Sequence, residues 1–203
     1  MEYNHPFHNR IFTLGEYTRL LNDAFSTMPT LRKVSRSGLI PRSFSERIML
    51  AVTQVNGCRY CAYGHTKMAL EAGVPEAEIL QLMQGEFDDL PANEVKALLF
   101  AEHYADTVGN PDPEMCAALL ATYGHDVSAG ILAYSRMIMI GNALGNMFDA
   151  FLYRLRLRPV PGSRFLDEIG VLFGSLLLIP ILGMYQALRH LLVPTTRCER
   201  LSS

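Results

Sequence analysis

The chain has 203 residues, of which 49% are apolar and 19% are charged, and its formal net charge is -2. A chain of this length can bury one well-formed core, so we expect one domain with an appendage. The nearly balanced charge argues against a nucleic-acid-binding protein, because such domains are usually strongly basic. The charges are unevenly placed, since Lys96 is the only base between Glu71 and Asp126. This acidic stretch is either a set of solvated helix faces or one half of a complementary interface in an oligomer.

The cysteine content also limits the class of protein. The four cysteines, Cys58, Cys61, Cys116 and Cys198, are too few for a disulfide scaffold at this length. The N-terminus has no basic segment followed by an apolar run, so we expect no secretory signal. These features predict a reducing, cytoplasmic location. In that compartment a close C-x-x-C pair is more often redox-active or metal-binding than a structural bridge.

The first part of the chain is expected to be helical with one interruption. Apolar residues at helical spacing predict a helix from Ile11 to Met28. The stretch from Pro29 to Arg42 is rich in proline, serine and basic residues, so we expect a loop or short turns there. Ser43 and Glu46 then have the spacing of a capping box, which predicts the start of a second helix.

The middle of the chain continues with helices. Asn56-Gly57 is a helix stop signal, so Cys58 is expected at or near the start of the next helix, which runs to about Ala72. Another helix is expected to begin at Pro75. Further helices are expected at about 92–108, 113–123 and 127–157, the last two separated by a break at 124–126. The long last helix carries small residues that permit close contacts with other helices, namely Gly130, Gly141 and Gly145. Because no stretch alternates with period two, the predicted fold class is all-α.

The composition changes after Gly162. The segment from Ile169 to Tyr185 has no charged residue and includes Pro180. It lies at the short limit of a membrane span, and the proline would kink it. We therefore divide the chain into a helical domain over 1–160 and an apolar helical appendage over 161–203. The favoured role of the appendage is packing against the domain or a neighbouring subunit, and the alternative is membrane contact through 169–185.

The chemistry of the chain is expected around its C-x-x-C motif. Cys61 and His65 are four residues apart on one helix face, so they can approach each other as a nucleophile and its base. A helix N-terminus favours the thiolate of Cys58, whereas the histidine favours Cys61. We assign Cys61 as the attacking thiol, because a base must lie within hydrogen-bond reach of the proton that it takes. Cys58 then resolves the sulfenic acid to a disulfide, and Glu46 is placed to orient His65 and strengthen it as a base.

Each of these residues also has a simpler interpretation. Glu46 can serve only as a helix cap, and His65 can be a hydrogen-bonded core histidine. Cys58, Cys61 and His65 could bind zinc, but a closed structural site needs a fourth ligand and the sequence offers no second C-x-x-C. Outside this set we expect ordinary structural roles. These are a buried small hydrophobe for Cys116, a tail thiol for Cys198, surface or capping positions for His103 and His125, and subunit bridging for Asn142 and Asn146.

The pattern Glu46-x11-Cys58-x2-Cys61-x3-His65 in an all-helical chain resembles the alkylhydroperoxidase AhpD-like branch of the carboxymuconolactone decarboxylase family. The similarity covers about residues 40–155, and the segment after about 162 lies outside the family core. The best-known members carry a histidine just before the second cysteine, where this chain has Tyr60. Tyrosine can donate a hydrogen bond there, but it cannot act as a base at neutral pH.

The resemblance implies an AhpD-like all-α bundle, usually trimeric or hexameric, that reduces peroxides. It implies that Cys61 attacks the peroxide, that Cys58 resolves, and that Glu46 and His65 relay protons, with Tyr60 as an auxiliary residue. The implied reductant is a dithiol protein or a lipoyl group. No nucleotide, haem or flavin motif is present in the sequence, so we expect no cofactor and no metal.

Two other hypotheses stay open at this point. The first is a decarboxylase or isomerase that uses His65 and Glu46 without thiol redox chemistry. The second is a non-enzymatic helical oligomer, either a scaffold or a membrane-associated module, in which the segment 169–185 is the functional part.

Overall fold

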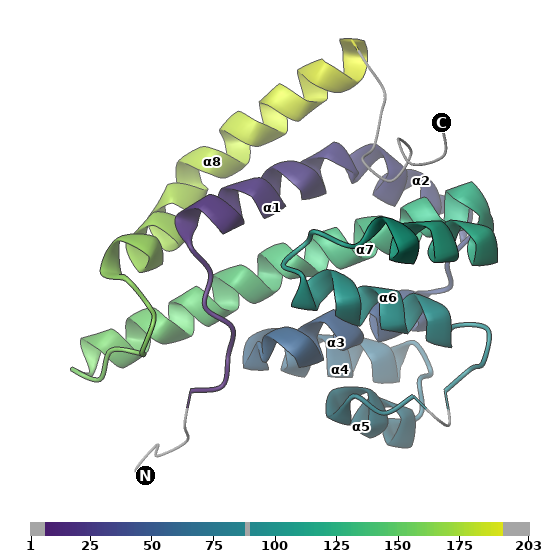
Figure 1. The fold of residues 1–203 in the computed structure, drawn as a ribbon, viewed down its shortest axis with the longest axis horizontal. Coiled ribbons are helices and arrows are strands. Elements are labelled where there is room, and N and C mark those ends of the chain that lie inside the picture. Colours follow the sequence, from purple (N-terminus) through teal and green to yellow (C-terminus); the bar gives the residue numbers. More distant parts are fainter. Residues whose placement is uncertain (1–6, 88–89, 193–203) are drawn as a thin grey trace.

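The computed structural model describes residues 7–87 and 90–192, and this part of the chain forms eight helices and no strand (Figure 1). The predicted all-α fold class is therefore confirmed. The helices in chain order are α1 (Leu14–Ser26), α2 (Met28–Ser37), α3 (Arg42–Asn56), α4 (Arg59–Glu71), α5 (Glu76–Gln84), α6 (Val95–Asp106), α7 (Pro113–Leu155) and α8 (Phe165–Leu192).

The long helix α7 runs through the molecule and contacts α1, α2, α3, α4, α6 and α8. Figure 1 shows α3, α4, α5 and α6 on one side of α7, and α1 and α8 on the other. The core lies along α7, where Ile131 and Met139 are fully buried together with Leu50 of α3 and Leu98 of α6. α3 packs against α4, α5, α6 and α7, so most of its residues are buried on several sides. α3 is thus a fixed support for the α4 helix that follows it.

The expected loop over 29–42 is wrong for most of its length, because α2 occupies Met28–Ser37. Pro29 lies in the first turn of α2, where a proline costs no hydrogen bond and its φ suits the helix. Val34 is the buried contact of α2, and it packs beside Gly130 of α7, where a Cβ would lie only 3.0 Å from Val34 Cγ1. A contact across nearly a hundred residues therefore supports a helix that the local composition does not favour.

The expected capping box of Ser43 and Glu46 is also wrong. Helix α3 begins one residue before Ser43, with Pro41 at its N-cap, and the Glu46 carboxylate hydrogen-bonds to His65 instead. A capping box does occur at α1, where Thr13 Oγ1 accepts from the Glu16 backbone N–H and the Glu16 carboxylate accepts from the Thr13 backbone N–H.

The two helices expected at 113–123 and 127–157 are the two arms of α7. The predicted break lies at Gly124, whose φ of 69° and ψ of 174° are not helical. Only glycine adopts this conformation readily. The residues beyond it carry the α7 arm onward to the site of the two cysteines.

Helix α8 lies on the domain along α1 and α7. Three polar contacts fix it to α1: Leu14 N–H donates to Asp167 Oδ1 (3.0 Å), Ser175 Oγ to Tyr17 Oη (2.8 Å), and Gln186 Nε2 to Asn22 Oδ1 (2.6 Å). These contacts are spread from the beginning of α8 to near its end. The appendage that was expected after residue 160 is therefore held against the domain along most of its helix.

By length and composition, two helices of the described chain are apolar enough to cross a membrane, namely α7 and residues 165–189 of α8. The most apolar window of α7 is 61% buried in the protein, whereas that of α8 is 17% buried. α7 is therefore the core helix of the domain. α8 leaves most of its apolar surface uncovered by the rest of the chain.

Candidate active site at the start of helix α4

The two cysteines lie at the beginning of α4. Gly57 ends α3 in the left-handed conformation (φ 71°), and the next residue, Cys58, is the N-cap of α4. Cys58 is fully buried and Cys61 is partly exposed. Their sulfur atoms are 2.7 Å apart, and Cys58 Sγ also accepts from the Cys61 backbone N–H at 3.4 Å. Both cysteines are free thiols in this structure.

The contact between the sulfurs makes the two cysteines chemically different. The hydrogen bond from Cys58 is the main cause that lowers the pKa of Cys61, which falls to about 7 from 9.0. Burial opposes this shift, while Asn142 and the nearby His65 assist it. The same hydrogen bond raises the pKa of Cys58, and its burial raises that pKa further. Of the two sulfurs, the more exposed one is therefore the one that ionises near neutral pH.

His65 and Glu46 form a pair across α3 and α4. His65 Nδ1 lies 2.8 Å from Glu46 Oε2, and both side chains are largely buried. Cys61 and His65 lie one turn apart on α4, and the nearby His65 lowers the pKa of Cys61. The structure therefore brings together the four residues predicted from the sequence. Glu46 orients the ring of His65 and leaves Nε2 as the other site for a proton.

Two glycines of α7 make room for the sulfur atoms. A Cβ at Gly145 would lie 2.6 Å from Cys58 Sγ, and one at Gly141 would lie 3.7 Å from Cys61 Sγ. Real Cβ atoms do not approach a sulfur as closely as the first of these distances. The predicted role of these glycines in close helix contacts is confirmed, and the contact that they permit is with the cysteine pair itself.

A buried amide network connects α7 with the end of α3. Asn142 Oδ1 accepts from Asn56 Nδ2 (3.0 Å), and Asn142 Nδ2 donates to Thr53 Oγ1 (3.1 Å). Asn146 Nδ2 donates to the backbone carbonyl of Asn56 (2.8 Å). Asn142 also hydrogen-bonds to Cys61 and lowers its pKa. The idea that Asn142 and Asn146 bridge subunits is wrong, because both side chains are fully buried within the chain.

Tyr60 lies beside the cysteine pair, but its hydroxyl is directed at Asp149 of α7. Tyr60 Oη donates to Asp149 Oδ1 (2.7 Å), and Arg59 bonds to both the Tyr60 hydroxyl and the same carboxylate. Burial raises the pKa of Tyr60, and the bond to Asp149 raises it further, so the hydroxyl stays protonated. The sequence did not indicate Asp149 or Arg59, because Asp149 lies 90 residues from Arg59 in the chain.

The other candidate residues take structural positions. Cys116 is buried, as predicted, and Cys198 lies outside the described residues. His103 Nε2 accepts from the Asp112 backbone N–H, and His125 is an exposed side chain beside Asp126. Within the described ranges, no three histidine, cysteine, aspartate or glutamate side chains converge to hold a metal ion.

The comparison with known families matches residues 23–103 to the model of the Carboxymuconolactone decarboxylase family. The match covers 81 of the 203 residues, and over this segment the chain is similar to that family. The segment contains all four predicted site residues, Glu46, Cys58, Cys61 and His65, and it begins earlier and ends earlier than the similarity expected over 40–155. The family includes AhpD-like peroxidases and carboxymuconolactone decarboxylases, and its members are typically enzymes. No curated protein and no solved structure matched the chain.

Proposed function

We propose that this chain is a thiol-dependent hydroperoxide reductase of the AhpD-like branch of the family. The observation that carries the proposal is the pairing of Cys58 and Cys61. A buried thiol donates to a more exposed sulfur 2.7 Å away, and the pKa of that second sulfur is lowered to about 7. Because the thiolate is the reactive form of cysteine, Cys61 is the nucleophile of the pair.

In the first step, the Cys61 thiolate attacks the terminal oxygen of the hydroperoxide ROOH. The sulfur–oxygen bond forms and the O–O bond breaks, which leaves Cys61 as a sulfenic acid. The departing alkoxide takes one proton and leaves as the alcohol ROH. His65, held by Glu46, supplies that proton, because its Nε2 is the ring nitrogen not bound to the carboxylate.

In the second step, the Cys58 sulfur attacks the Cys61 sulfenic sulfur. The sulfur–oxygen bond breaks, hydroxide leaves as water with the thiol proton, and a disulfide forms. The two sulfurs need to move little, since they are already in contact. The room left by Gly145 beside Cys58 permits that approach.

In the third step, an external dithiol returns the disulfide to two thiols and is itself oxidised to a disulfide. The reductant attacks the Cys61 sulfur, because Cys58 is fully buried and Cys61 is partly exposed. A dithiol protein or a lipoyl group is the proposed donor, and a reducing, cytoplasmic compartment would supply it. A homo-oligomer, such as a trimer or a hexamer, is the proposed assembly.

The test is peroxide consumption with dihydrolipoamide or a dithiol protein as the donor. We expect turnover in the wild type and in the control Cys116→Ala, and none in Cys61→Ser. In Cys58→Ser, a sulfenic acid should accumulate on Cys61 and react with dimedone. If dimedone marks Cys58 in a Cys61→Ser variant instead, the assigned roles are reversed and the proposal is wrong in its mechanism.

A second assay, with a lactone-type substrate, separates this proposal from the decarboxylase or isomerase alternative. That alternative uses Glu46 and His65 alone, so it requires turnover of a lactone-type substrate in a variant that lacks both cysteines. Undiminished turnover of this kind, together with no cysteine-dependent peroxide consumption, would replace the proposed reductase activity.

A further inference from the structure

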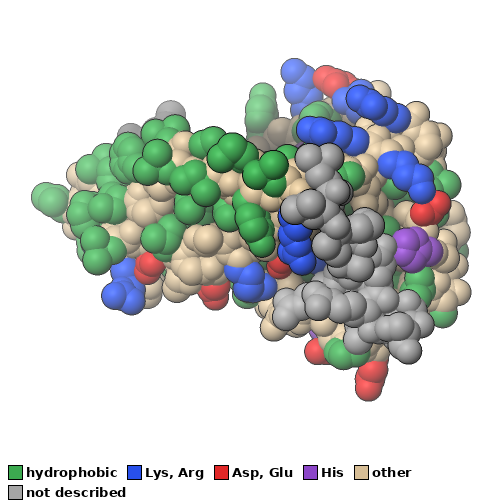
Figure 2. Space-filling view, turned by 90° about the horizontal axis from the view of Figure 1, so that it is seen from above, with side chains coloured by type: hydrophobic (Ala, Val, Ile, Leu, Met, Phe, Trp, Pro, Cys, Tyr) green, Lys and Arg blue, Asp and Glu red, His purple; other side chains and the backbone are tan. Residues whose placement is uncertain are grey.

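Helix α8 exposes a wide apolar surface beyond the stripe that it packs against α1 and α7. At about 100° per residue, the exposed side chains span about half of the helix circumference. Figure 2 shows hydrophobic side chains gathered over the elongated part of this face. We call this surface the α8 face, and its large side chains are Leu166, Phe173, Leu176, Leu177, Ile181, Met184, Tyr185 and Leu188. Large apolar side chains that are exposed together on one helix face mark a contact with a partner or a membrane.

At the start of α8, the acidic side chains are bonded within the chain, so the exposed charges there are basic. The carboxylate of Glu168 is fully buried and is held by Arg154 and Ser163. Asp167 is largely buried and accepts from the Leu14 backbone N–H. The acids of α8 are therefore neutralised within the chain.

Arginines remain exposed around both ends of the face. Arg156 and Arg158 follow α7, beside the exposed Leu155 and Leu157. Arg189 is exposed near the other end of α8. The α8 face is thus an uncharged apolar surface with basic side chains at each end, and this combination suits a surface that is both apolar and anionic, such as a lipid interface.

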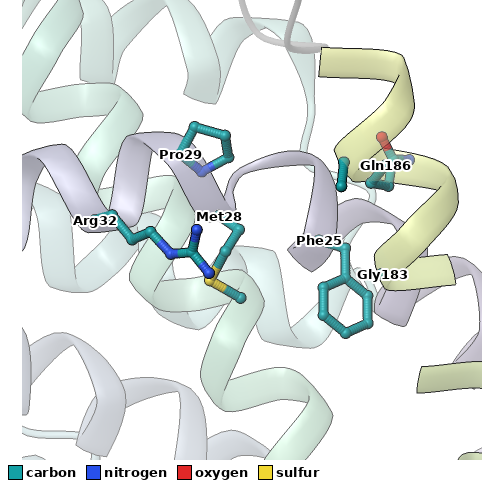
Figure 3. A pocket seen from close by; sticks show the side chains of 7 residues that line it. Phe25, Met28, Pro29, Arg32, Gly183 and Gln186 are labelled. Atoms are coloured by element: carbon teal, nitrogen blue, oxygen red, sulfur yellow. The ribbon is translucent and has the colours of Figure 1, made fainter. Parts of the chain in front are cut away.

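A pocket of about 390 Å³ adjoins the second end of the face. Figure 3 shows Met28 and Arg32 of α2 on one side of it and Gly183 and Gln186 of α8 on the other, with Phe25 of α1 below. Arg32 supplies a cation there. Gln186 Nε2 bonds to Asn22, while Gln186 Oε1 is buried and has no hydrogen-bond partner among the described residues. A ligand with an anionic group would pair with Arg32 in this pocket.

We propose that the α8 face docks the protein onto a bilayer that contains anionic phospholipids, with one lipid headgroup in the pocket at Arg32 and Gln186. The headgroup phosphate pairs with the Arg32 guanidinium, which lines the pocket. α8 lies in the plane of the interface and does not cross the bilayer, because its other side is bonded to α1 along its length.

The charges favour a lipid surface over a second copy of this chain. In a two-fold dimer through the α8 faces, antiparallel helices would place Arg156 and Arg158 of one copy near Arg189 of the other. Parallel helices would bring identical arginines together. Either arrangement sets cations against cations, whereas an anionic bilayer neutralises both ends at once.

The test is cosedimentation of the full chain with vesicles of phosphatidylcholine alone and with vesicles that also contain phosphatidylglycerol. We expect binding to the anionic vesicles, and its loss when the salt is raised from about 0.1 M to about 1 M. The variant Leu177→Glu/Met184→Glu should lose at least about tenfold in binding. Its matched control is Leu70→Glu/Leu80→Glu, which changes two exposed apolar residues on α4 and α5.

The cationic side chains are tested in the same assay. Arg32→Gln should lower binding about fivefold, and Arg156→Gln/Arg158→Gln about fivefold for each arginine removed. Lys96→Gln is the matched control, because Lys96 is an exposed base of α6. Circular dichroism and the melting temperature of each variant report whether its helices are intact.

Two outcomes would overturn the proposal. One is equal binding to both kinds of vesicle, or binding that the folded Leu177→Glu/Met184→Glu variant retains in full. The other is a wild-type dimer or larger oligomer that does not bind vesicles and that this variant converts to monomers. The second result would assign the α8 face to another copy of the chain. Neither outcome depends on peroxide turnover, so the proposed activity stands or falls separately.

Discussion

Replacing Cys58 by alanine should change the pH dependence of the Cys61 thiol. The hydrogen bond from Cys58 is the main cause that holds the pKa of Cys61 at about 7. Cys58→Ala removes that donor, so the pKa of Cys61 should rise toward its ordinary value of 9.0. The sign follows from the acid equilibrium: a higher pKa leaves less thiolate at any pH below it, and reactivity moves to more alkaline solution.

The size of the effect has two opposing parts. With a pKa of about 7, about half of Cys61 is thiolate at pH 7, and with a pKa of 9.0 about one molecule in a hundred is. The fraction of reactive thiol therefore falls about fiftyfold at most. A more basic thiolate is intrinsically a better nucleophile, by about tenfold for two pKa units. The observed alkylation rate at pH 7 should fall about fivefold, and the rate above pH 10 should rise about tenfold.

The assay is the rate of iodoacetamide alkylation against pH, with the modified residue identified by mass spectrometry. Cys58→Ser is the matched control, because its hydroxyl keeps a hydrogen-bond donor beside Cys61 and should give a smaller rise in pKa. The reasoning is refuted if Cys58→Ala leaves the midpoint of the pH profile near 7. It is equally refuted if Cys58, and not Cys61, is the residue alkylated first in the wild type.

Three further substitutions test the surroundings of the thiols. Glu46→Gln removes the charge that orients the imidazole and should slow peroxide turnover about a hundredfold, with an unchanged circular dichroism spectrum. Gly145→Ala places a Cβ 2.6 Å from Cys58 Sγ and should lower the free energy of unfolding in urea by about 1–3 kcal/mol, whereas Gly64→Ala, with open space around it, should raise it by up to about 1 kcal/mol. Tyr60→Phe leaves a buried carboxylate without one donor and should cost about 1–3 kcal/mol in the same measurement; an unfolding midpoint equal to that of the wild type would contradict it.

The cysteine pair and His65 could be predicted from the sequence because their geometry is local. Residues three and four apart on one helix share a face whatever the rest of the chain does. The helix stop at Asn56-Gly57 placed Cys58 at the N-terminus of α4, and the structure has it there. Glu46 was harder to place, since its spacing from Ser43 fits a cap. Its side chain instead crosses to His65 on the next helix.

The residues that the sequence did not indicate are those whose partners are distant in the chain. Asp149 meets Arg59 and Tyr60 only because α7 packs beside α4. The same packing makes Gly145 a neighbour of Cys58. Single-sequence spacing carries no signal for such contacts, because nothing local to residue 149 differs from an ordinary acidic position on a helix. Helix α2 was missed for the same reason, as its buried Val34 is supported by α7.

The position of Tyr60 decides how protons can reach the site. The best-known AhpD-like proteins have a histidine there, which could exchange protons with the thiols. In this chain the Tyr60 hydroxyl donates to Asp149 and is held by Arg59, and its pKa is raised, so it is a fixed neutral donor that points at the carboxylate. In the proposed mechanism, proton transfer at Cys61 therefore falls to the Glu46–His65 pair. The proposed reductase should lose peroxide turnover as the pH falls below about 7, because the Cys61 thiolate is then protonated.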